Sequence, residues 1–162
     1  MAQEMRSPIE SGCPDAFQYM HPVMRKNYGQ WAYHEDPQPG VLVHVSNNGD
    51  KIWTVRAGTQ RILDVYTLRT LCDIGDKYGE GYIHFTIRSN IEYQVADEAK
   101  VEPLIKALRD AGFIVGGTRN SVAMISHTQG WLHCDIPGTD ASGVVKSMMD
   151  ELIDEFKEAN MP

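Results

Sequence analysis

Cysteine is scarce in this sequence and long apolar runs are missing, and each shortage excludes a class of protein. The 162 residues contain three widely spaced cysteines (Cys13, Cys72 and Cys134), too few for a disulfide-stapled scaffold. A chain of this length buries roughly 70% of its unfolded surface and needs no such staples. No apolar run approaches the ~20 residues that cross a bilayer, and the first residues lack the apolar core of a signal peptide. We therefore expect no membrane span and a cytoplasmic location.

Positive charge is also scarce overall, which argues against a nucleic-acid partner. The sequence has 22 acidic against 15 basic residues, a net charge of −7, and lacks the basic stripe of a nucleic-acid surface. Glycine-rich phosphate loops are missing too, since Gly116-Gly117 and Gly79-Glu-Gly81 match neither dinucleotide-binding nor P-loop spacing. An anionic ligand is still possible, because six of the fifteen bases fall between residues 51 and 88 and electrostatic fields are local.

The hydrophobic pattern of residues 41–118 predicts one α+β domain. Strands are expected over residues 41–45, 51–57, 82–87, 91–95 and 113–115. Helices are expected over residues 67–78 and from Asp97 to Gly112, the second with Val101, Leu104, Ile105 and Leu108 on one face. From residue 51 the order strand, helix, strand, strand, helix, strand is the split βαβ arrangement of a ferredoxin-like sandwich.

The segments on either side differ from this domain. Residues 1–40 contain prolines and little periodicity but many aromatics, so we expect an extended arm that lies on another surface of this chain or of a partner. Residues 119–162 offer one strand at 122–125 and one helix opened by Asp140 or Ser142. The expected buried side of that helix consists of Val144, Val145, Met148, Met149, Leu152 and Phe156. One strand and one helix cannot enclose a core, so we expect the beginning of a second domain and a chain that is a piece of something larger.

Three arginines are candidates for an anion site. Arg56 and Arg88 stand at the ends of neighbouring predicted strands, each on the face that carries a threonine, and Arg119 follows the last strand. A guanidinium presents a planar fork that matches carboxylates and oxyanions. Together the three would form a tripod for a polyanion. The alternative, two solvated surface arginines, is equally compatible with the alternation.

A second candidate cluster is formed by His127, His133 and Cys134. Imidazole and thiolate are common ligands of transition metals, and three such residues within eight positions exceed the background. Structural zinc sites normally show paired ligands at short spacing, of which only one half is present, so a structural role is the more frequent alternative. Cys72 lies on the apolar stripe of its predicted helix and is expected in the core, whereas Cys13 has no partner in the arm.

Four motifs resemble the beta subunit of dissimilatory sulfite reductase, over residues 7–162. They are Trp53–Gly58 (WTVRAG), Phe85–Asn90 (FTIRSN), His127–Cys134 (HTQGWLHC) and Pro137–Gly143 (PGTDASG). The resemblance implies an oxidoreductase of two alpha and two beta subunits that interconverts sulfite and sulfide by six electrons. It also implies siroheme, a macrocycle rich in carboxylates, coupled to a 4Fe-4S iron–sulfur cluster. The implied partners are the alpha subunit and a small sulfur-carrier protein, with sulfite as substrate.

The resemblance also implies roles for individual residues. Arg56, Arg88 and Arg119 match basic positions near siroheme or its anionic substrate. Thr86, His127, Thr128 and Gln129 would line the same pocket, with Arg88 also binding the cofactor. Cys134 matches the first of four cluster cysteines, and the run that supplies the other three is absent from this sequence.

The resemblance places residues 41–118 in a ferredoxin-like domain and residues 119–162 at the start of the siroheme and cluster domain. Two other functions stay open. The first is a non-catalytic fragment that only binds a partner subunit through its aromatic arm. The second is an assimilatory sulfite or nitrite reductase, which the loop ending in Cys134 disfavours.

Overall fold

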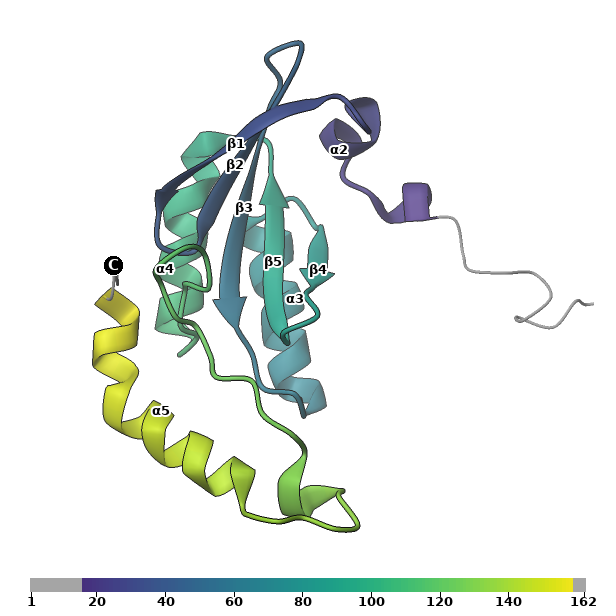
Figure 1. The fold of residues 1–162 in the computed structure, drawn as a ribbon. Coiled ribbons are helices and arrows are strands. Elements are labelled where there is room, and N and C mark those ends of the chain that lie inside the picture. The colour runs from purple at the N-terminus through teal and green to yellow at the C-terminus, as the bar shows by residue number, and fades with distance from the viewer. Residues whose placement is uncertain (1–15, 159–162) are drawn as a thin grey trace, which may run out of the picture.

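The structure, a computed structural model, describes residues 16–158 and centres on a five-stranded antiparallel sheet of order β1-β2-β3-β5-β4 (Figure 1). The strands are β1 (Trp31–Gln38), β2 (Val41–Ser46), β3 (Lys51–Gly58), β4 (Ile83–Phe85) and β5 (Asn90–Val95). The helices are α2 (Pro22–Lys26), α3 (Val65–Tyr78), α4 (Val101–Asp110) and α5 (Ala141–Glu158), with short 3-10 turns at Ala16–Tyr19, Glu98–Lys100 and Gly130–Leu132. The predicted α+β, ferredoxin-like class is confirmed.

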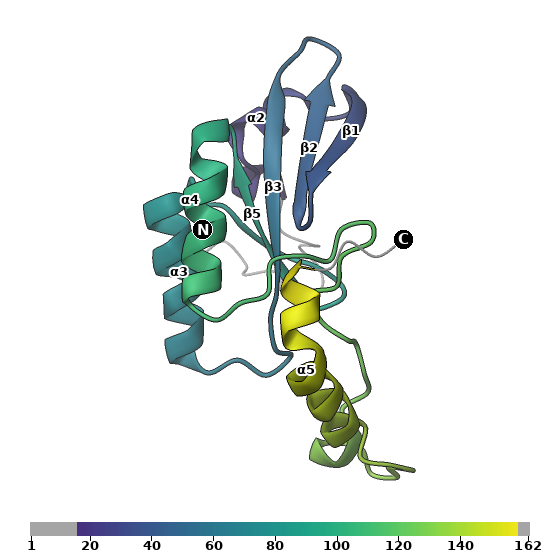
Figure 2. The ribbon, with the colours of Figure 1, turned by 90° about the vertical axis from the view of Figure 1, so that its left-hand side faces the viewer.

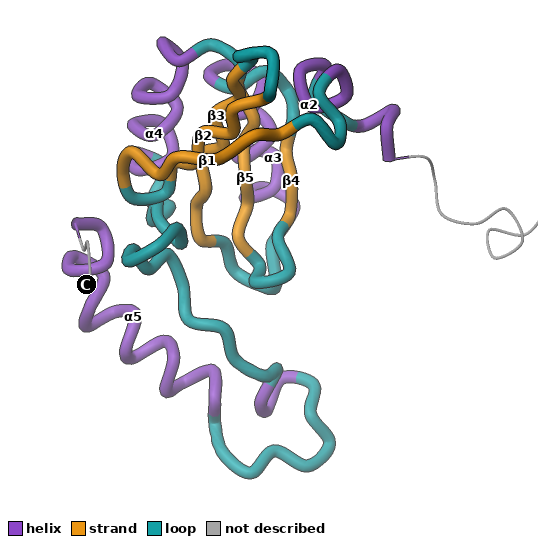
Figure 3. Tube along the Cα trace, turned by 45° about the horizontal axis from the view of Figure 1, so that its top comes forward, coloured by secondary structure: helices purple, strands orange, loops and turns teal. Residues whose placement is uncertain are grey.

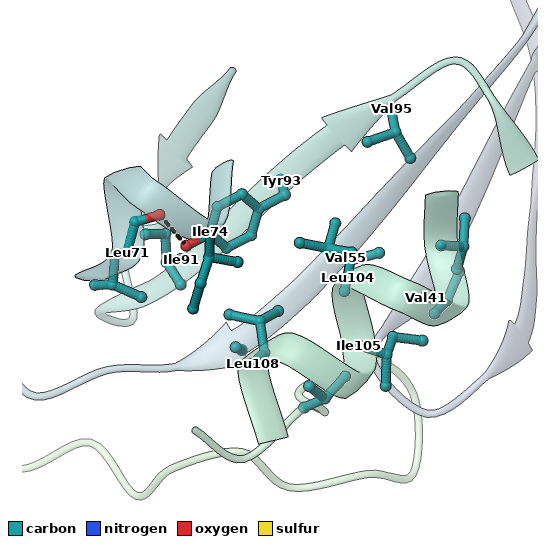
Figure 4. Close-up of a cluster of buried hydrophobic side chains, with 13 residues drawn as sticks. Val41, Val55, Leu71, Ile74, Ile91, Tyr93, Val95, Leu104, Ile105 and Leu108 are labelled. Atoms are coloured by element: carbon teal, nitrogen blue, oxygen red, sulfur yellow. Dashed lines mark hydrogen bonds between the residues drawn. The ribbon is translucent and has the colours of Figure 1, made fainter. Parts of the chain in front are cut away.

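Two helices cover one face of the sheet because their apolar stripes meet its apolar side chains. Figure 2 shows α3 and α4 on one side of the sheet, with the segment that follows α4 on the other. The predicted stripe of α4 is buried in full at Val101, Leu104, Ile105 and Leu108. Figure 4 shows Leu104, Ile105 and Leu108 in one cluster with Val55 of β3 and Tyr93 of β5, and the buried Tyr93 hydroxyl donates a 2.9 Å hydrogen bond to the Leu71 carbonyl. Alternation along the strands leaves the opposite face to polar side chains.

The last strand of the predicted split βαβ arrangement is reduced to one bridge. Val115 pairs with Ala57 at the end of β3, flanked by hydrogen bonds from Gly58 N to the Ile114 carbonyl (2.9 Å) and from Gly116 N to the Arg56 carbonyl (3.1 Å). A longer ladder cannot form there, because β2 already pairs with β3 over Lys51 to Val55.

Three sequence-based expectations are wrong in detail. Residues 122–125 form no strand, and β4 ends at Phe85 instead of 87, so that Ile87 is fully exposed in the turn before β5. Cys72 is exposed and not in the core. The buried face of α3 runs through Leu71, Ile74 and Gly75, and position 72 lies about 100° further around the helix axis.

The segment that precedes β2 is only partly the predicted arm. Trp31–Gln38 is extended, as predicted, but it pairs with β2 as the edge strand of the sheet. Upstream of it, His21 caps α2 and is 3% exposed, with its Nε2 2.6 Å from Glu80 Oε2. Lys100 Nζ lies 3.1 Å from the other Glu80 oxygen, so this carboxylate ties α2 to the sheet domain. Residues 1–15 of the predicted arm lie outside the described range.

The C-terminal helix packs on the domain mainly through its second half. Phe156 is buried with Ile114 and Ala123 in a small second cluster, whereas Val144 and Met148 are about half exposed, contrary to prediction. Figure 3 shows that the first half of α5 and the loop before it extend away from the sheet, which is why these side chains find no cover. The Asp140 carboxylate accepts a 3.0 Å hydrogen bond from Gly143 N, so Asp140 and not Ser142 opens the helix. No helix among residues 16–158 combines the length and apolarity of a membrane span.

Candidate anion-binding site

A cavity of about 400 Å³ lies on the sheet face opposite α3 and α4, between the ends of β3 and β5 and the segment after Gly116. Its lining includes all three predicted arginines, Arg56, Arg88 and Arg119. The other lining residues are His34, Asp36, Leu42, Asn90, Gly117, Thr118, Ser121, Val122, Ala123, Met124 and Ser126. The structure therefore gathers residues that are up to 92 positions apart in the sequence (34 to 126) into one site.

Arg56 braces the cavity wall. Its Nε and Nη2 lie 2.6 and 2.5 Å from Glu92 Oε1, and its Nη1 donates to the Gly117 carbonyl at 2.5 Å. The Arg56 and Glu92 side chains are 15% and 8% exposed, and Glu92 Oε2 also contacts His84 Nδ1 at 2.9 Å. All three guanidinium nitrogens are thus engaged, and a carboxylate balances their charge. Three of the five Arg56 N–H donors are thus used inside the protein, and the Glu92 carboxylate offsets its attraction for an anion.

The turn that Arg56 holds requires glycine. Gly117 has a φ of +80°, a region that is costly for residues with a Cβ. A Cβ at this position would lie 3.0 Å from Asn90 Nδ2 and 3.2 Å from Arg56 Cδ. Glycine thus lets the backbone approach both side chains and keeps this side of the cavity open.

Arg88 is the unbalanced cation of the cavity. It stands in the turn between β4 and β5, which is shaped by Ser89 at a φ of 61° and by a 3.1 Å hydrogen bond from Asn90 N to Thr86 Oγ1. Its side chain is exposed, and no carboxylate between residues 16 and 158 forms an ion pair with it. An exposed, unpaired guanidinium on a cavity wall can bind an incoming anion without breaking another contact.

Arg119 is loosely paired. It has a φ of 42°, its side chain is 71% exposed, and its Nε lies 3.6 Å from Asp36 Oδ2, which is beyond hydrogen-bond distance. The Asp36 side chain is 6% exposed, and its Oδ1 is 3.3 Å from Thr118 Oγ1. The free N–H groups of Arg119 remain available to a ligand.

Sequence reasoning missed three polar residues of this face: Asp36, Asn90 and Glu92. Asn90 is 3% exposed, and its Oδ1 has no hydrogen-bond partner among the described residues. The alternation of β5 places Asn90 and Glu92 on the same face, a signal that the sequence already carries. Asp36 had no such signal, because its position depends on the irregular pairing of β1 with β2 between Glu35 and Gln38.

Two histidines extend this polar face toward the sheet edge. The His34 and His44 rings lie side by side, with centroids 6.2 Å apart. Burial is the largest cause that lowers the pKa of His44, and the neighbouring His34 adds to it, while Glu92 opposes the shift. The lowered pKa favours the uncharged form of His44.

The other predicted site residues lie elsewhere. His127 lines a second cavity of about 680 Å³ beside α5, where Arg61 Nη1 donates to its carbonyl at 2.5 Å. Thr86, Thr128 and Gln129 line neither of these two cavities. Thr86 instead shapes the turn before β5 through hydrogen bonds with Ser89 and Asn90. The shared pocket predicted for these four residues with the arginines is therefore not assembled in this structure.

Cys134 stands alone. It is exposed on the loop before α5, with its backbone N–H donating to the Gly130 carbonyl at 3.0 Å. Within residues 16–158 no group of three or more His, Cys, Asp or Glu side chains is placed to hold a metal ion. The cluster of His127, His133 and Cys134 is thus a cluster in sequence only.

The fold is that of a ferredoxin-like α+β domain, and comparison with known proteins shows which proteins of this class the chain resembles. Residues 44–111 match the family model of the nitrite/sulfite reductase ferredoxin-like half domain. Over 150 residues the chain is 49% identical to the dissimilatory-type sulfite reductase subunit beta of Archaeoglobus fulgidus, covering 88% of this chain and 41% of the relative. The corresponding subunit of Nitratidesulfovibrio vulgaris is 47% identical (90% and 40%), and that of Megalodesulfovibrio gigas 42% identical (99% and 64%).

These comparisons confirm the resemblance seen in the motifs: the chain is homologous to dissimilatory-type sulfite reductase beta subunits. It spans about two fifths of the length of the first two relatives.

Proposed function

We propose that this chain supplies the N-terminal part of a dissimilatory-type sulfite reductase beta subunit and that its arginine cavity binds an anion. The observation that carries the proposal is that Arg88 and Arg119 are both exposed and line the same cavity, and that Arg88 has no ion-pair partner among the described residues. The anion would be sulfite or a carboxylate of siroheme. The reaction is the six-electron interconversion of sulfite and sulfide, in an enzyme that also contains the alpha subunit.

The cavity fits part of siroheme. About 400 Å³ accommodates carboxylate side arms but not a whole macrocycle, so the remaining contacts would come from other parts of the enzyme. Siroheme, when bound, would supply the redox-active iron. Arg88 and Arg119 would hold and orient anionic oxygens by charge-assisted hydrogen bonds, while Arg56 would keep the wall in place through Gly117.

The 4Fe-4S cluster does not fit the described residues. Four thiolates hold such a cluster, whereas Cys134 has no second cysteine near it in the described part of the chain. Cys134 as one cluster ligand stays a prediction. The small sulfur-carrier protein and the cytoplasmic location likewise stay predictions.

The alternative function, a module that only binds a partner subunit, is favoured by exposed aromatics at the N-terminal side. Tyr19, Tyr28 and Tyr33 are 70%, 59% and 54% exposed, as expected for side chains that another subunit covers. The two functions are compatible in one subunit and differ in a single requirement: only the first needs the arginine cavity to bind a ligand.

A binding experiment separates them. The purified chain is titrated with sulfite and, separately, with siroheme, and binding is followed by ¹⁵N NMR of the arginine Nε–H and asparagine amide groups. Arg88→Gln should weaken both ligands by about tenfold or more, because it removes a charge-assisted hydrogen bond. Arg109→Gln, an exposed residue of α4 on the other side of the sheet, is the matched control and should change binding by less than about twofold. If Arg88→Gln binds sulfite and siroheme as the wild type does, the anion-binding function fails and only the partner-binding function is left.

A further inference from the structure

Asp36 is a buried carboxylate in a cavity that otherwise attracts anions. Its Oδ2 is buried and receives no hydrogen bond from any described residue, although Arg119 Nε lies 3.6 Å away. Buried oxygen atoms without a donor are rare, and they often mark a place where a ligand or water supplies the missing hydrogen. Its other oxygen is already oriented by Thr118 Oγ1, which in turn accepts a hydrogen bond from Gly40 N at 2.9 Å.

The position of Asp36 limits which anions Arg119 can hold. An oxyanion that binds Arg119 through Nε must lie a few ångströms from Asp36 Oδ2, because only 3.6 Å separate that oxygen from Nε. Two negatively charged oxygens at such a distance repel each other strongly at a partly buried site. A ligand oxygen that carries a proton removes the repulsion, since its O–H donates to the free carboxylate oxygen.

Asn90 adds a second acceptor of the same kind. Its Oδ1 is buried without a partner on the same cavity, and the side chain as a whole is 3% exposed. The nearby cations do not serve these acceptors: Arg56 is engaged with Glu92 and Gly117, and Arg88 is exposed in its turn. The cavity thus combines cations that bind anionic oxygens with acceptors that require a hydrogen donor.

We propose that Asp36 makes this cavity selective for oxyanions that carry a proton, such as hydrogen sulfite, over oxyanions that carry none, such as sulfate. This inference rests on the proposed function, because it takes the arginine cavity to be an oxyanion site. Asp36 acts by repulsion against the wrong ligand as much as by attraction for the right one, a common origin of specificity.

Hydrogen phosphate and sulfate are the matched probes, since both are tetrahedral and of similar size but only phosphate carries a proton at neutral pH. The purified chain is titrated with each, and with sulfite, and binding is followed by NMR at Asn90 and the arginine Nε–H groups. The wild-type chain should bind phosphate about tenfold or more tightly than sulfate, because a site built to accept a ligand hydrogen bond rejects ligands without one. Asp36→Asn should bring the ratio of phosphate affinity to sulfate affinity close to one, mainly by raising the affinity for sulfate.

The control is Glu35→Gln, which removes the same charge from the neighbouring, exposed residue of β1 outside the cavity lining, and should keep the wild-type ratio. A wild-type ratio near one, or an unchanged ratio in folded Asp36→Asn, would overturn the role of Asp36 while leaving the anion site in place. If Asp36→Asn does not fold, the ratio of phosphate to sulfate affinity in the wild-type chain alone tests the role of Asp36. If neither anion binds, or if Arg88→Gln binds both as the wild type does, the proposed function fails and the inference with it.

Discussion

Glu92 and Arg56 form the central ion pair of the candidate site, with both Arg56 Nε and Nη2 directed at one oxygen of Glu92 at 2.6 and 2.5 Å. The pair joins neighbouring positions of β3 and β5, and through Gly117 it reaches the loop that closes the cavity. Arg56, which the resemblance places near siroheme or its anionic substrate, holds the neighbouring loop in position in this structure.

The Glu92–Arg56 pair should contribute strongly to stability. Glu92→Ala leaves a largely buried guanidinium without its carboxylate, and we expect a loss of about 3 kcal/mol in the free energy of unfolding. Urea denaturation measures it. The double variant Arg56→Met/Glu92→Leu should be more stable than Glu92→Ala, because it removes both charges. Asp110→Asn, which breaks the exposed Lys106–Asp110 pair, is the control and should cost under about 0.5 kcal/mol. An equally small loss in the free energy of unfolding for Glu92→Ala would contradict a stabilising role of the Glu92–Arg56 pair.

The attachment of α2 should depend on pH through Glu80. Burial by itself would raise the pKa of Glu80, but hydrogen bonds from His21, Lys100 and the Ala96 backbone outweigh it and lower the pKa from 4.5 to about 2. A carboxyl whose folded pKa is depressed stabilises the fold fully above its unfolded pKa and loses this contribution as pH falls through the folded value. We therefore expect a loss of about 1–3 kcal/mol between pH 4.5 and 2.

Urea denaturation across that pH range checks the contribution of Glu80. In Glu80→Gln the loss of stability between pH 4.5 and 2 should be smaller than in the wild type. Glu98→Gln, at an exposed position, should show the same loss of stability as the wild type. Equal pH profiles for the wild type and Glu80→Gln would show that this carboxylate does not anchor α2.

The cavity wall should not tolerate a side chain at Gly117. Alanine at this position would have a strained φ and would also make close contacts with Asn90 and Arg56. The loss in the free energy of unfolding should therefore exceed about 2 kcal/mol. Gly49→Ala supplies the comparison, because Gly49 has a similar φ of +88° but open space around it, and should cost about 1 kcal/mol. Thermal unfolding measures both. Similar losses for the two variants would mean that the contacts around Gly117 are looser than described.

Cys72 and Cys134 should both react as surface thiols. In a Cys13→Ser background, a thiol reagent added to the folded chain should modify two cysteines at rates close to those of a small free thiol, because both are exposed. Single serine variants assign the two reactions, and each should change the free energy of unfolding by less than about 0.5 kcal/mol. A Cys72 that reacts only after denaturation would restore the core position expected from the helical pattern.

Local periodicity accounts for the parts of the fold that were predicted well. The i, i+3, i+4, i+7 spacing of Val101, Leu104, Ile105 and Leu108 specifies the buried face of α4 without reference to any partner. It failed at Cys72, where two overlapping apolar stripes were possible and only the packing of α3 on Tyr93 selects one. It failed again at residues 122–125, because an apolar run becomes a strand only where an unpaired strand edge is available.

The sequence by itself determined the kinship with sulfite reductase beta subunits, through motifs that carry Arg56, Arg88 and Cys134, and it determined the order of helices and strands from β2 to α4. Only the tertiary structure decided what these residues do locally. Whether an arginine is free or engaged depends on the residue across the strand pair, and thus on register, which places Glu92 opposite Arg56. Likewise Asp36 meets Thr118 and Arg119 only because β1 joins the sheet at its edge. Such contacts between distant positions arise from the closure of the chain on itself, and local sequence patterns do not encode them.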